Sequence, residues 1–413
     1  MVHMKEVYPP KEWCKYHFEI AKKPIDPELY DEEAVIEYLD GLDVCHDRKK
    51  IIKYGRAGNP FRLMHWHYPV IPDHLLSRKL IKIWSEMNHA LFVTDDILES
   101  FDESEMRQVC DAFQMLDKHL CDLQFPDFPT QDEMKNWLSQ RNVNDKVIPQ
   151  VLFWTNFGIS VVKAALQLGQ FSLDDVKYYW RRMSVVSALY YEAIKTNCSP
   201  CKVPYYELIW RRLFDGHVMI WGISFEAVRG AIGKLKGHLP LVNELGFLFS
   251  SFVVTVNDIY SESREKEDGL KACNVFRSLT EGETASTESD VVENSVRVVN
   301  SIIEVMYKKI EKAKEENPDN TDLCNVLDNM GAAVVGWLVF HQLTPRYKDG
   351  GWRLSLVEVT GEKLEEWKRS KDEDLPEEVK YLLYHFSPKG KAKQLSDYIQ
   401  SGVINMHGNL LPA

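Results

Sequence analysis

The chain has 413 residues, of which 45% are hydrophobic and 27% are charged, a composition that excludes a disordered or collagen-like protein. It carries 50 lysines and arginines against 62 aspartates and glutamates, a formal net charge of −12. Because nucleic acids and anionic membranes attract basic surfaces, this balance argues against a nucleic-acid partner. An anionic ligand would need bound cations to hold it.

The chain shows no sign of a targeting or membrane segment. Its start, MVHMKEVYPPKEW, lacks an apolar signal sequence. The longest apolar runs, such as residues 331–340, have about half of the ~20 residues that a membrane span requires. The sequence therefore predicts a soluble, cytoplasmic protein without a transmembrane segment.

Apolar residues recur every three or four positions along most of the chain, the period of an α-helix. This pattern predicts helices over residues 79–101, 147–168, 174–195, 205–236, 241–267, 291–314 and 322–342. The β-branched strings LFVT (91–94) and FVVTV (252–256) favour strands locally, but each continues a longer helical period. Residues 278–290 are expected to form a polar loop. The prediction is an all-α fold, a single large helical bundle over residues 1–347 with a charge-rich C-terminal extension at 348–413 packed on it.

Two short motifs carry the chemistry. In the first, Thr94-Asp95-Asp96-Ile97-Leu98-Glu99, the carboxylates of Asp95 and Glu99 fall one helical turn apart, and a divalent cation between them would relieve their repulsion. In the second, Asn257, Ser261 and Glu265 are spaced four and four, so that an amide, a hydroxyl and a carboxylate oxygen share one helix face. The first motif alone is also typical of a solvated acidic helix end. For the second, the apolar run before it weakens the interpretation as an ordinary polar patch. Together, each after an apolar run, they indicate a multi-metal clamp for a diphosphate.

At this point the sequence resembles the class I terpene synthases. The string at 257–265 matches their (N/D)DxxSxxxE motif, and the string at 95–99 resembles their aspartate-rich motif with Glu in place of the last Asp. Arg346-Tyr347 resembles their C-terminal RY pair, and residues 212–216 (RLFDG) resemble their R-x-x-D-G element. The order of the four motifs also agrees. Among these enzymes the chain is most similar to the microbial type with one α-domain, and within that type to terpene cyclases of octocorals.

The resemblance implies a set of roles. Three Mg²⁺ ions would be held by Asp95, Asp96, Glu99, Asn257, Ser261 and Glu265. The substrate diphosphate would be bound by Arg212, Arg264, Arg346 and Tyr347, since the guanidinium fork suits phosphate oxygens. Asp215 would link the diphosphate-sensing arginine to Gly216, at a helix break. Two alternatives stay open here: Arg211 in place of Arg212, and Gly216 as an ordinary interior glycine.

A carbocation must be kept from water, so the resemblance also implies an apolar cavity enclosed by the bundle. Aromatic faces stabilise cations at short range. The cavity candidates are Phe92, Trp221, Phe225 and Phe340, with Trp66 and Trp154 as weaker ones. Each of these side chains is also compatible with ordinary core packing.

The resulting functional hypothesis is a magnesium-dependent terpene cyclase that ionises a linear prenyl diphosphate, cyclises the carbocation to a hydrocarbon or alcohol and releases pyrophosphate. Geranylgeranyl diphosphate is the favoured substrate and farnesyl diphosphate the next, for a monomer or homodimer. No DxDD string supports cyclisation initiated by protonation. A chain-elongating prenyl diphosphate synthase would be expected to carry two DDxxD-type motifs. A non-catalytic helical metal-binding protein is the third alternative.

Overall fold

The structure is a computed structural model of the 413-residue chain. It describes residues 3–15, 26–59, 63, 75–98, 100–122, 126–167, 169, 171–197, 208–209, 212–213, 218–267, 288–344, 347 and 352–387. The first part contains β1 (His3–Val7), α1 (Lys11–Cys14), α3 (Glu32–Gly41), α4 (Arg48–Gly58), α6 (Leu75–Leu98), α7 (Glu103–Asp122), α8 (Gln131–Ser139), α9 (Ile148–Gln167) and α10 (Leu173–Asn197). The second part contains α12 (Val218–Val228), the 3₁₀ turn η1 (Lys236–His238), α13 (Leu239–Glu267), α15 (Glu288–Glu316), α16 (Thr321–Leu343), β2 (Trp352–Leu356), α17 (Glu362–Arg369), the 3₁₀ turn η3 (Asp372–Asp374) and α18 (Glu377–His385).

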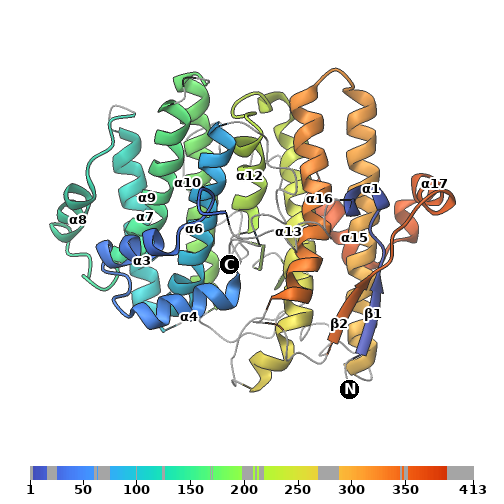
Figure 1. Cartoon of the computed structure of the whole chain (residues 1–413), viewed down its shortest axis with the longest axis horizontal. Coiled ribbons are helices and arrows are strands. Elements are labelled where there is room, and N and C mark those ends of the chain that lie inside the picture. Colours follow the sequence, from blue (N-terminus) through green and yellow to red (C-terminus); the bar gives the residue numbers. More distant parts are fainter. Residues whose placement is uncertain are drawn as a thin grey trace.

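The long helices form one bundle, as the sequence predicts. Helix α6 packs on α9 and α12, α12 packs on α10 and α13, and α13 packs on α15 and α16 (Figure 1). Both segments of strand-like composition, LFVT and FVVTV, are helical within α6 and α13. Burial of their apolar side chains against neighbouring helices outweighs the weak β preference of the branched residues.

The prediction of one helix over residues 205–236 is wrong in its C-terminal part. Helix α12 ends at Val228, and a turn and η1 lead to α13. Gly230 and Gly233 have φ angles of 68° and 77°, which residues with a Cβ rarely adopt, so they end the helix and reverse the chain. Residues 278–287 of the predicted polar loop lie outside the described residues, and α15 begins at Glu288.

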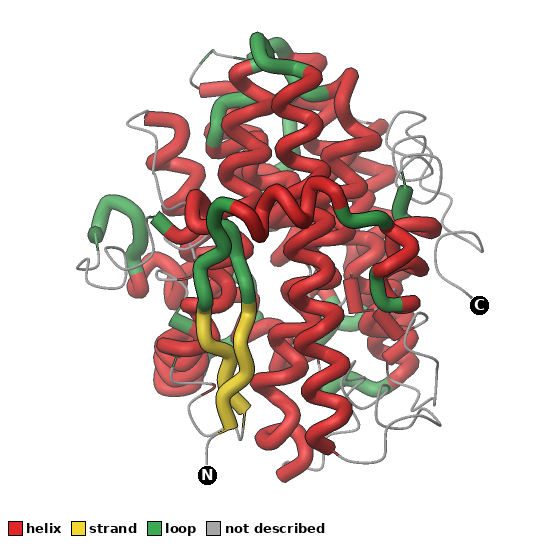
Figure 2. Tube along the Cα trace, turned by 90° about the vertical axis from the view of Figure 1, so that its right-hand side faces the viewer, coloured by secondary structure: helices red, strands yellow, loops and turns green. Residues whose placement is uncertain are grey.

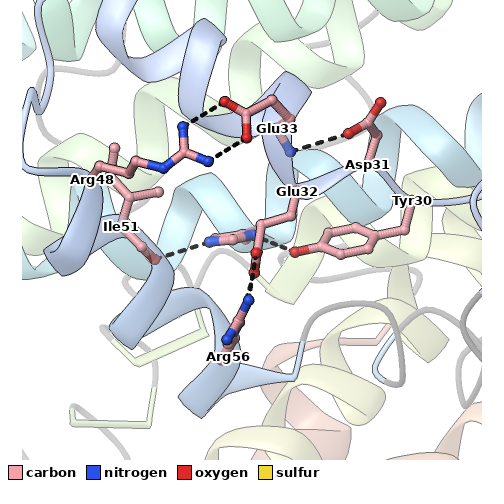
Figure 3. A network of polar contacts seen from close by, with 8 residues as sticks. Tyr30, Asp31, Glu32, Glu33, Arg48, Ile51 and Arg56 are labelled. Atoms are coloured by element: carbon pink, nitrogen blue, oxygen red, sulfur yellow. Dashed lines mark hydrogen bonds and ion pairs between the residues drawn. The ribbon is translucent and has the colours of Figure 1, made fainter.

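Short N-terminal helices pack on the outside of α6 through polar contacts (Figure 3). Arg48 of α4 donates two hydrogen bonds to the Glu33 carboxylate of α3, and Arg56 pairs with Glu32. The buried His89 ring of α6 accepts the Tyr30 hydroxyl at Nδ1 (2.6 Å) and donates from Nε2 to the Ile51 carbonyl (3.0 Å). This histidine is therefore a neutral Nε2–H tautomer that joins α6 to α4.

A two-stranded parallel sheet was not predicted. Strand β1 pairs with β2 in the register His3↔Trp352 to Val7↔Leu356, and Figure 2 shows the two strands side by side on one face of the bundle. Two five-residue strands so far apart in the chain leave no local signal in the sequence. Strand β2 also contacts α13 and α16, and α17 and α18 contact α15.

Two described helical spans, Lys236–Ser261 and Thr321–Leu343, are long and apolar enough to cross a membrane, because continuous helices join the short apolar runs of the sequence. In the fold, 89% and 83% of their most apolar windows are buried. Both spans belong to mostly buried helices of the bundle, and packing against protein explains their apolar character.

Candidate functional site

The second predicted motif lies on the C-terminal half of α13. The residues before it, from Phe252 to Val256, are buried, so this half of the helix is surrounded by the bundle. Asn257 follows as a half-buried amide, and its hydrogen bonds join three segments of the chain. Its Oδ1 atom lies 2.8 Å from the Tyr347 hydroxyl and 3.4 Å from Nε2 of His341 on α16. The second motif and the tyrosine of the predicted RY pair thus meet at one amide.

Aromatic rings surround this amide. The His341 ring lies 4.4 Å from the Tyr347 ring and 5.1 Å from the Tyr260 ring, between centroids. The backbone N–H of Leu354 in β2 donates to the Tyr260 hydroxyl (3.0 Å), and Trp337 Nε1–H of α16 donates to the Val253 carbonyl of α13 (3.0 Å). These bonds fix α16 and β2 against α13 beside the motif.

Ser261 lies one helical turn beyond Asn257 on the same face of α13. Its side chain is 1% exposed, and its hydroxyl oxygen has no hydrogen-bond partner among the residues that the structure describes. A buried hydroxyl left in this state costs free energy, so such an oxygen is unusual in a folded protein unless a ligand satisfies it.

The predicted diphosphate sensor Arg212 contacts the same helix at the residue next to Asn257. Its guanidinium donates to Oδ1 of Asp258 at 2.6 Å, with the arginine side chain 17% exposed and the aspartate fully buried. The R-x-x-D-G element suggests Asp215 as the partner of Arg212, and the contact with Asp258 was not predicted. Spacing could not indicate this pair, because the two residues are 46 positions apart in the chain.

The first motif lies at the C-terminal end of α6. Asp95 and Asp96 are half-buried, and the hydroxyl of Tyr190, a fully buried residue of α10, donates to Oδ1 of Asp95 at 3.4 Å. Phe92, one turn earlier, is also half-buried. The carboxylate is therefore held at the boundary between the packed interior and a more open space.

Helix directions place the two motifs at the same end of the bundle. The Ser77 hydroxyl near the start of α6 donates to the carbonyl of Val228 at the end of α12, so these helices are antiparallel. Asp95 lies 18 residues beyond Ser77, about 27 Å along α6. Asn257 lies 18 residues beyond Leu239, where the chain has turned back from α12, also about 27 Å along α13. Helix α12 packs between α6 and α13, with Arg212 shortly before its start (Figure 1).

The aromatic candidates differ in their surroundings. Phe225 is fully buried and packs on Phe249, so the core-packing interpretation fits it. Phe340 is also fully buried, with its ring 6.1 Å from that of Tyr347 and 5.1 Å from Trp337. Trp154 packs edge-on against Tyr190, the partner of Asp95. Among the candidates whose side chains the structure describes, Phe92 alone is partly exposed, and it lies next to the first motif.

Several predicted site residues lie outside the described residues, in backbone or side chain. They are Trp66, Glu99, Arg211, Asp215, Gly216, Trp221, Arg264, Glu265 and Arg346. Within the described part of the chain, no cluster of three or more His, Cys, Asp or Glu side chains forms a metal site on its own. The described candidates for magnesium are instead carboxylate, amide and hydroxyl oxygens. These are the ligands that Mg²⁺ prefers. The Ser261 hydroxyl, which has no hydrogen-bond partner in the described part of the chain, fits such an ion.

Comparisons with known proteins agree at the level of the fold. No family model matches the sequence, and no curated protein matches it. Solved structures do match: SVS_A2, a protein from ancestral sequence reconstruction, in a variant at 12% identity, covers 93% of this chain and 98% of its own with a TM-score of 0.56. A variant of cucumene synthase, at 11% identity, covers 83% and 99% with a TM-score of 0.52.

A third match is 2-methylisoborneol synthase from Streptomyces coelicolor A3(2), in complex with Mg²⁺ and geranyl-S-thiolodiphosphate. At 16% identity it covers 84% of this chain and 96% of its own, with a TM-score of 0.52. The matched enzymes are terpene synthases, and the all-α fold of this chain is the class I terpene synthase fold.

Proposed function

We propose that this protein is a magnesium-dependent terpene cyclase. The observation that carries the proposal is the meeting of motifs on α13: Asn257 contacts Tyr347, and the adjacent Asp258 contacts Arg212. Three of the four strings that resemble terpene synthase motifs thus converge on one helix, in a fold that terpene synthases share. The first motif lies at the same end of the bundle.

In this proposal, three Mg²⁺ ions would be held by Asp95, Asp96 and Glu99 of the first motif together with Asn257, Ser261 and Glu265 of the second. When bound, the ions would stabilise the charge that builds on the leaving diphosphate. The neighbour that contains Mg²⁺ and a geranyl thiolodiphosphate supports this choice of ion and of substrate class.

The protein's own groups would bind, orient and shield the substrate. Arg212, Arg346 and Arg264 supply guanidinium donors to the diphosphate, and Tyr347 supplies a hydroxyl donor. Asp258 holds Arg212 in place by a buried ion pair. Asp215 and Gly216 would form the link and helix break between this arginine and the start of α12. Phe92 and Phe340 would contribute to a dry cavity wall, with Trp221 and Phe225 as further candidates.

The finer assignments belong to the same proposal. They are a cytoplasmic enzyme, monomeric or homodimeric, related most closely to octocoral cyclases, with geranylgeranyl diphosphate preferred over farnesyl diphosphate. The C-terminal extension from residue 348 would be part of the same domain, since β2 pairs with β1 and contacts α13 and α16.

The test is incubation of the purified chain with C10, C15, C20 and C25 prenyl diphosphates and Mg²⁺, with pyrophosphate release measured and the organic products analysed by mass spectrometry. A cyclase releases pyrophosphate from an allylic diphosphate alone and yields a cyclic product. A requirement for isopentenyl diphosphate would identify a chain-elongating synthase instead. No release from any substrate would contradict the proposal and favour a non-catalytic helical protein.

A further inference from the structure

The side-chain amide of Asn257 has an acceptor atom, Oδ1, and a donor atom, Nδ2, and the neighbouring polar groups that the structure describes contact only Oδ1. Oδ1, which can only accept hydrogen bonds, lies 2.8 Å from the Tyr347 hydroxyl and 3.4 Å from His341 Nε2. The other end, Nδ2, makes no hydrogen bond to any residue that the structure describes. An amide donor is thus left unused while two groups share its acceptor.

The hydrogen bonds of His341 determine what Nε2 can do. Its Nδ1 lies 3.0 Å from the Trp337 carbonyl, which only accepts, so Nδ1 carries a proton. The ring is 1% exposed and is enclosed by Trp337, Phe340, Tyr260 and Tyr347. Burial among these rings disfavours a charged imidazolium. The neutral Nδ1–H tautomer presents a bare lone pair at Nε2, which needs a donor and not the Asn257 oxygen.

We propose that His341 is a positioning residue that holds the Asn257 amide in a metal-binding orientation. In this orientation the amide is turned by 180° about its Cβ–Cγ bond, and Nδ2 donates to His341 Nε2 and to the Tyr347 oxygen. Oδ1 then points away from these two residues. The inference rests on the proposed function, since Oδ1 is the Asn257 atom that would bind Mg²⁺.

The same rotation of the Asn257 amide changes the role of Tyr347. With Oδ1 facing it, the tyrosine commits its only hydroxyl proton to Asn257. With Nδ2 facing it, the tyrosine oxygen accepts a hydrogen bond from the amide, and its hydroxyl proton is no longer committed to Asn257. One amide orientation therefore prepares both a metal ligand and a substrate donor.

The proposal explains why this chain has Asn and not Asp at position 257, where the matched motif allows either. Both ends of an aspartate are oxygens, so an aspartate needs no orienting partner. Its second oxygen would, however, face the lone pair of His341. The contribution of His341 to metal binding should therefore depend on whether position 257 is Asn or Asp.

A double-mutant cycle tests this dependence, with Mg²⁺ affinity in the presence of inorganic pyrophosphate measured by calorimetry. We expect His341→Phe, which fills the same space without an acceptor, to weaken Mg²⁺ binding about 10- to 100-fold, the usual cost of losing a residue that orients a metal ligand. His341→Gln, whose amide oxygen can still accept from Asn257, should stay within about threefold of the wild type. In the Asn257→Asp background, His341→Phe should weaken Mg²⁺ binding only slightly or should strengthen it.

An additive cycle, in which His341→Phe costs the same in both backgrounds, would overturn the proposal and leave His341 as a packing residue. Circular dichroism of each variant separates local effects from unfolding. Equal losses for His341→Gln and His341→Phe would also overturn it.

A second readout needs no metal. In protein labelled with ¹⁵N-histidine, His341 should show a protonated Nδ1 and an Nε2 that accepts a hydrogen bond, and its signals are assigned by their loss in His341→Phe. His89, with a protonated Nε2, is the internal control of opposite tautomer. A protonated Nε2 at His341 would overturn the inference. The expected tautomer together with no Mg²⁺ binding by the wild type in the presence of pyrophosphate would contradict the proposed function. The metal-binding part of the inference, which rests on that function, would then also be contradicted.

Discussion

Asn257 and Asp258 are adjacent in the chain but face different environments. Asn257 is half-buried and contacts Tyr347, whereas Asp258 is fully buried and contacts Arg212. The roughly 100° rotation between neighbouring helical residues makes this division possible. One residue of the motif is therefore available for a ligand, while the next stabilises the helix and fixes an arginine.

The metal ligands give the first prediction. We expect Asn257→Ala and Asp95→Ala each to lower magnesium-dependent turnover by about 100-fold or more, because each removes an oxygen that would hold a charge-stabilising ion. Helical content by circular dichroism should stay near that of the wild type, since both residues are only half-buried. Near-normal turnover in either variant would contradict the metal assignment.

The Arg212–Asp258 ion pair gives the second prediction, in which stability and activity separate. Arg212→Met leaves the buried Asp258 carboxylate without this partner and should lower the free energy of unfolding by about 3–5 kcal/mol. Arg212→Met combined with Asp258→Leu should recover most of that loss, because an apolar pair replaces the charges. Turnover should remain low in both, since the diphosphate loses a guanidinium. Recovery of turnover in the double variant would show that Arg212 is purely structural.

Asp117 gives a pH-dependent prediction away from the site. Burial between α7 and α10 raises the pKa of Asp117 to about 6, and the Ser184 hydroxyl offsets part of this effect. Its ordinary pKa of 3.8 applies to the unfolded chain, so the folded protein binds the proton more tightly. This contribution to stability is present below about pH 4 and is lost as the pH rises through about 6, by about 2–3 kcal/mol.

Asp117→Asn removes the ionisable group and should abolish that dependence. Urea unfolding should show the variant to be more stable than the wild type at about pH 7.5, by about 2–3 kcal/mol, and of similar or lower stability at about pH 4. If the variant and the wild type differed in the free energy of unfolding by the same amount at both pH values, Asp117 would not be the source of the pH dependence.

At the scale of elements, the boundaries of six long helices were predictable within a few residues because each carries a continuous apolar period. The segment at 79–101 became α6 (Leu75–Leu98), and that at 241–267 became α13 (Leu239–Glu267). Contacts between elements were not predictable in this way. Neither the Asn257–Tyr347 bond nor the partner of Arg212 follows from spacing, because each joins residues that are distant in the chain.

Two helical glycines differ in how closely another element approaches them, which yields a matched pair of variants. A Cβ at Gly331 of α16 would lie 2.4 Å from the Trp13 ring of α1, whereas a Cβ at Gly222 of α12 would have ordinary contacts, the nearest at 3.8 Å. We expect Gly331→Ala to destabilise by about 1–3 kcal/mol through overpacking. Gly222→Ala should stabilise by up to about 1 kcal/mol, the helix propensity difference. Equal shifts of the melting temperature in the two variants would contradict the close approach of Trp13 to Gly331.

At the scale of the whole molecule, the N-terminal strand is part of the folded domain. Val7 in β1 is fully buried, whereas Met4 in the same strand is 59% exposed. Val7→Asp should therefore destabilise by several kcal/mol, because it buries an unpaired charge, while Met4→Asp should change stability by less than about 0.5 kcal/mol. Chemical denaturation of both variants tests this. Two near-neutral results would mean that β1 does not contribute to the stability of the bundle.

The pairing of β1 with β2 also has a consequence for biosynthesis. The side chain of Ser355 contacts the backbone of Lys5 across 350 positions of sequence, so β1 must wait for β2 to be synthesised before the two can pair. At translation speeds of about 5–20 residues per second, that delay is on the order of 20–70 s. Throughout this interval the nascent β1 exposes unpaired backbone groups that a molecular chaperone could cover, and its docking would complete the domain only after most of the helices have been made.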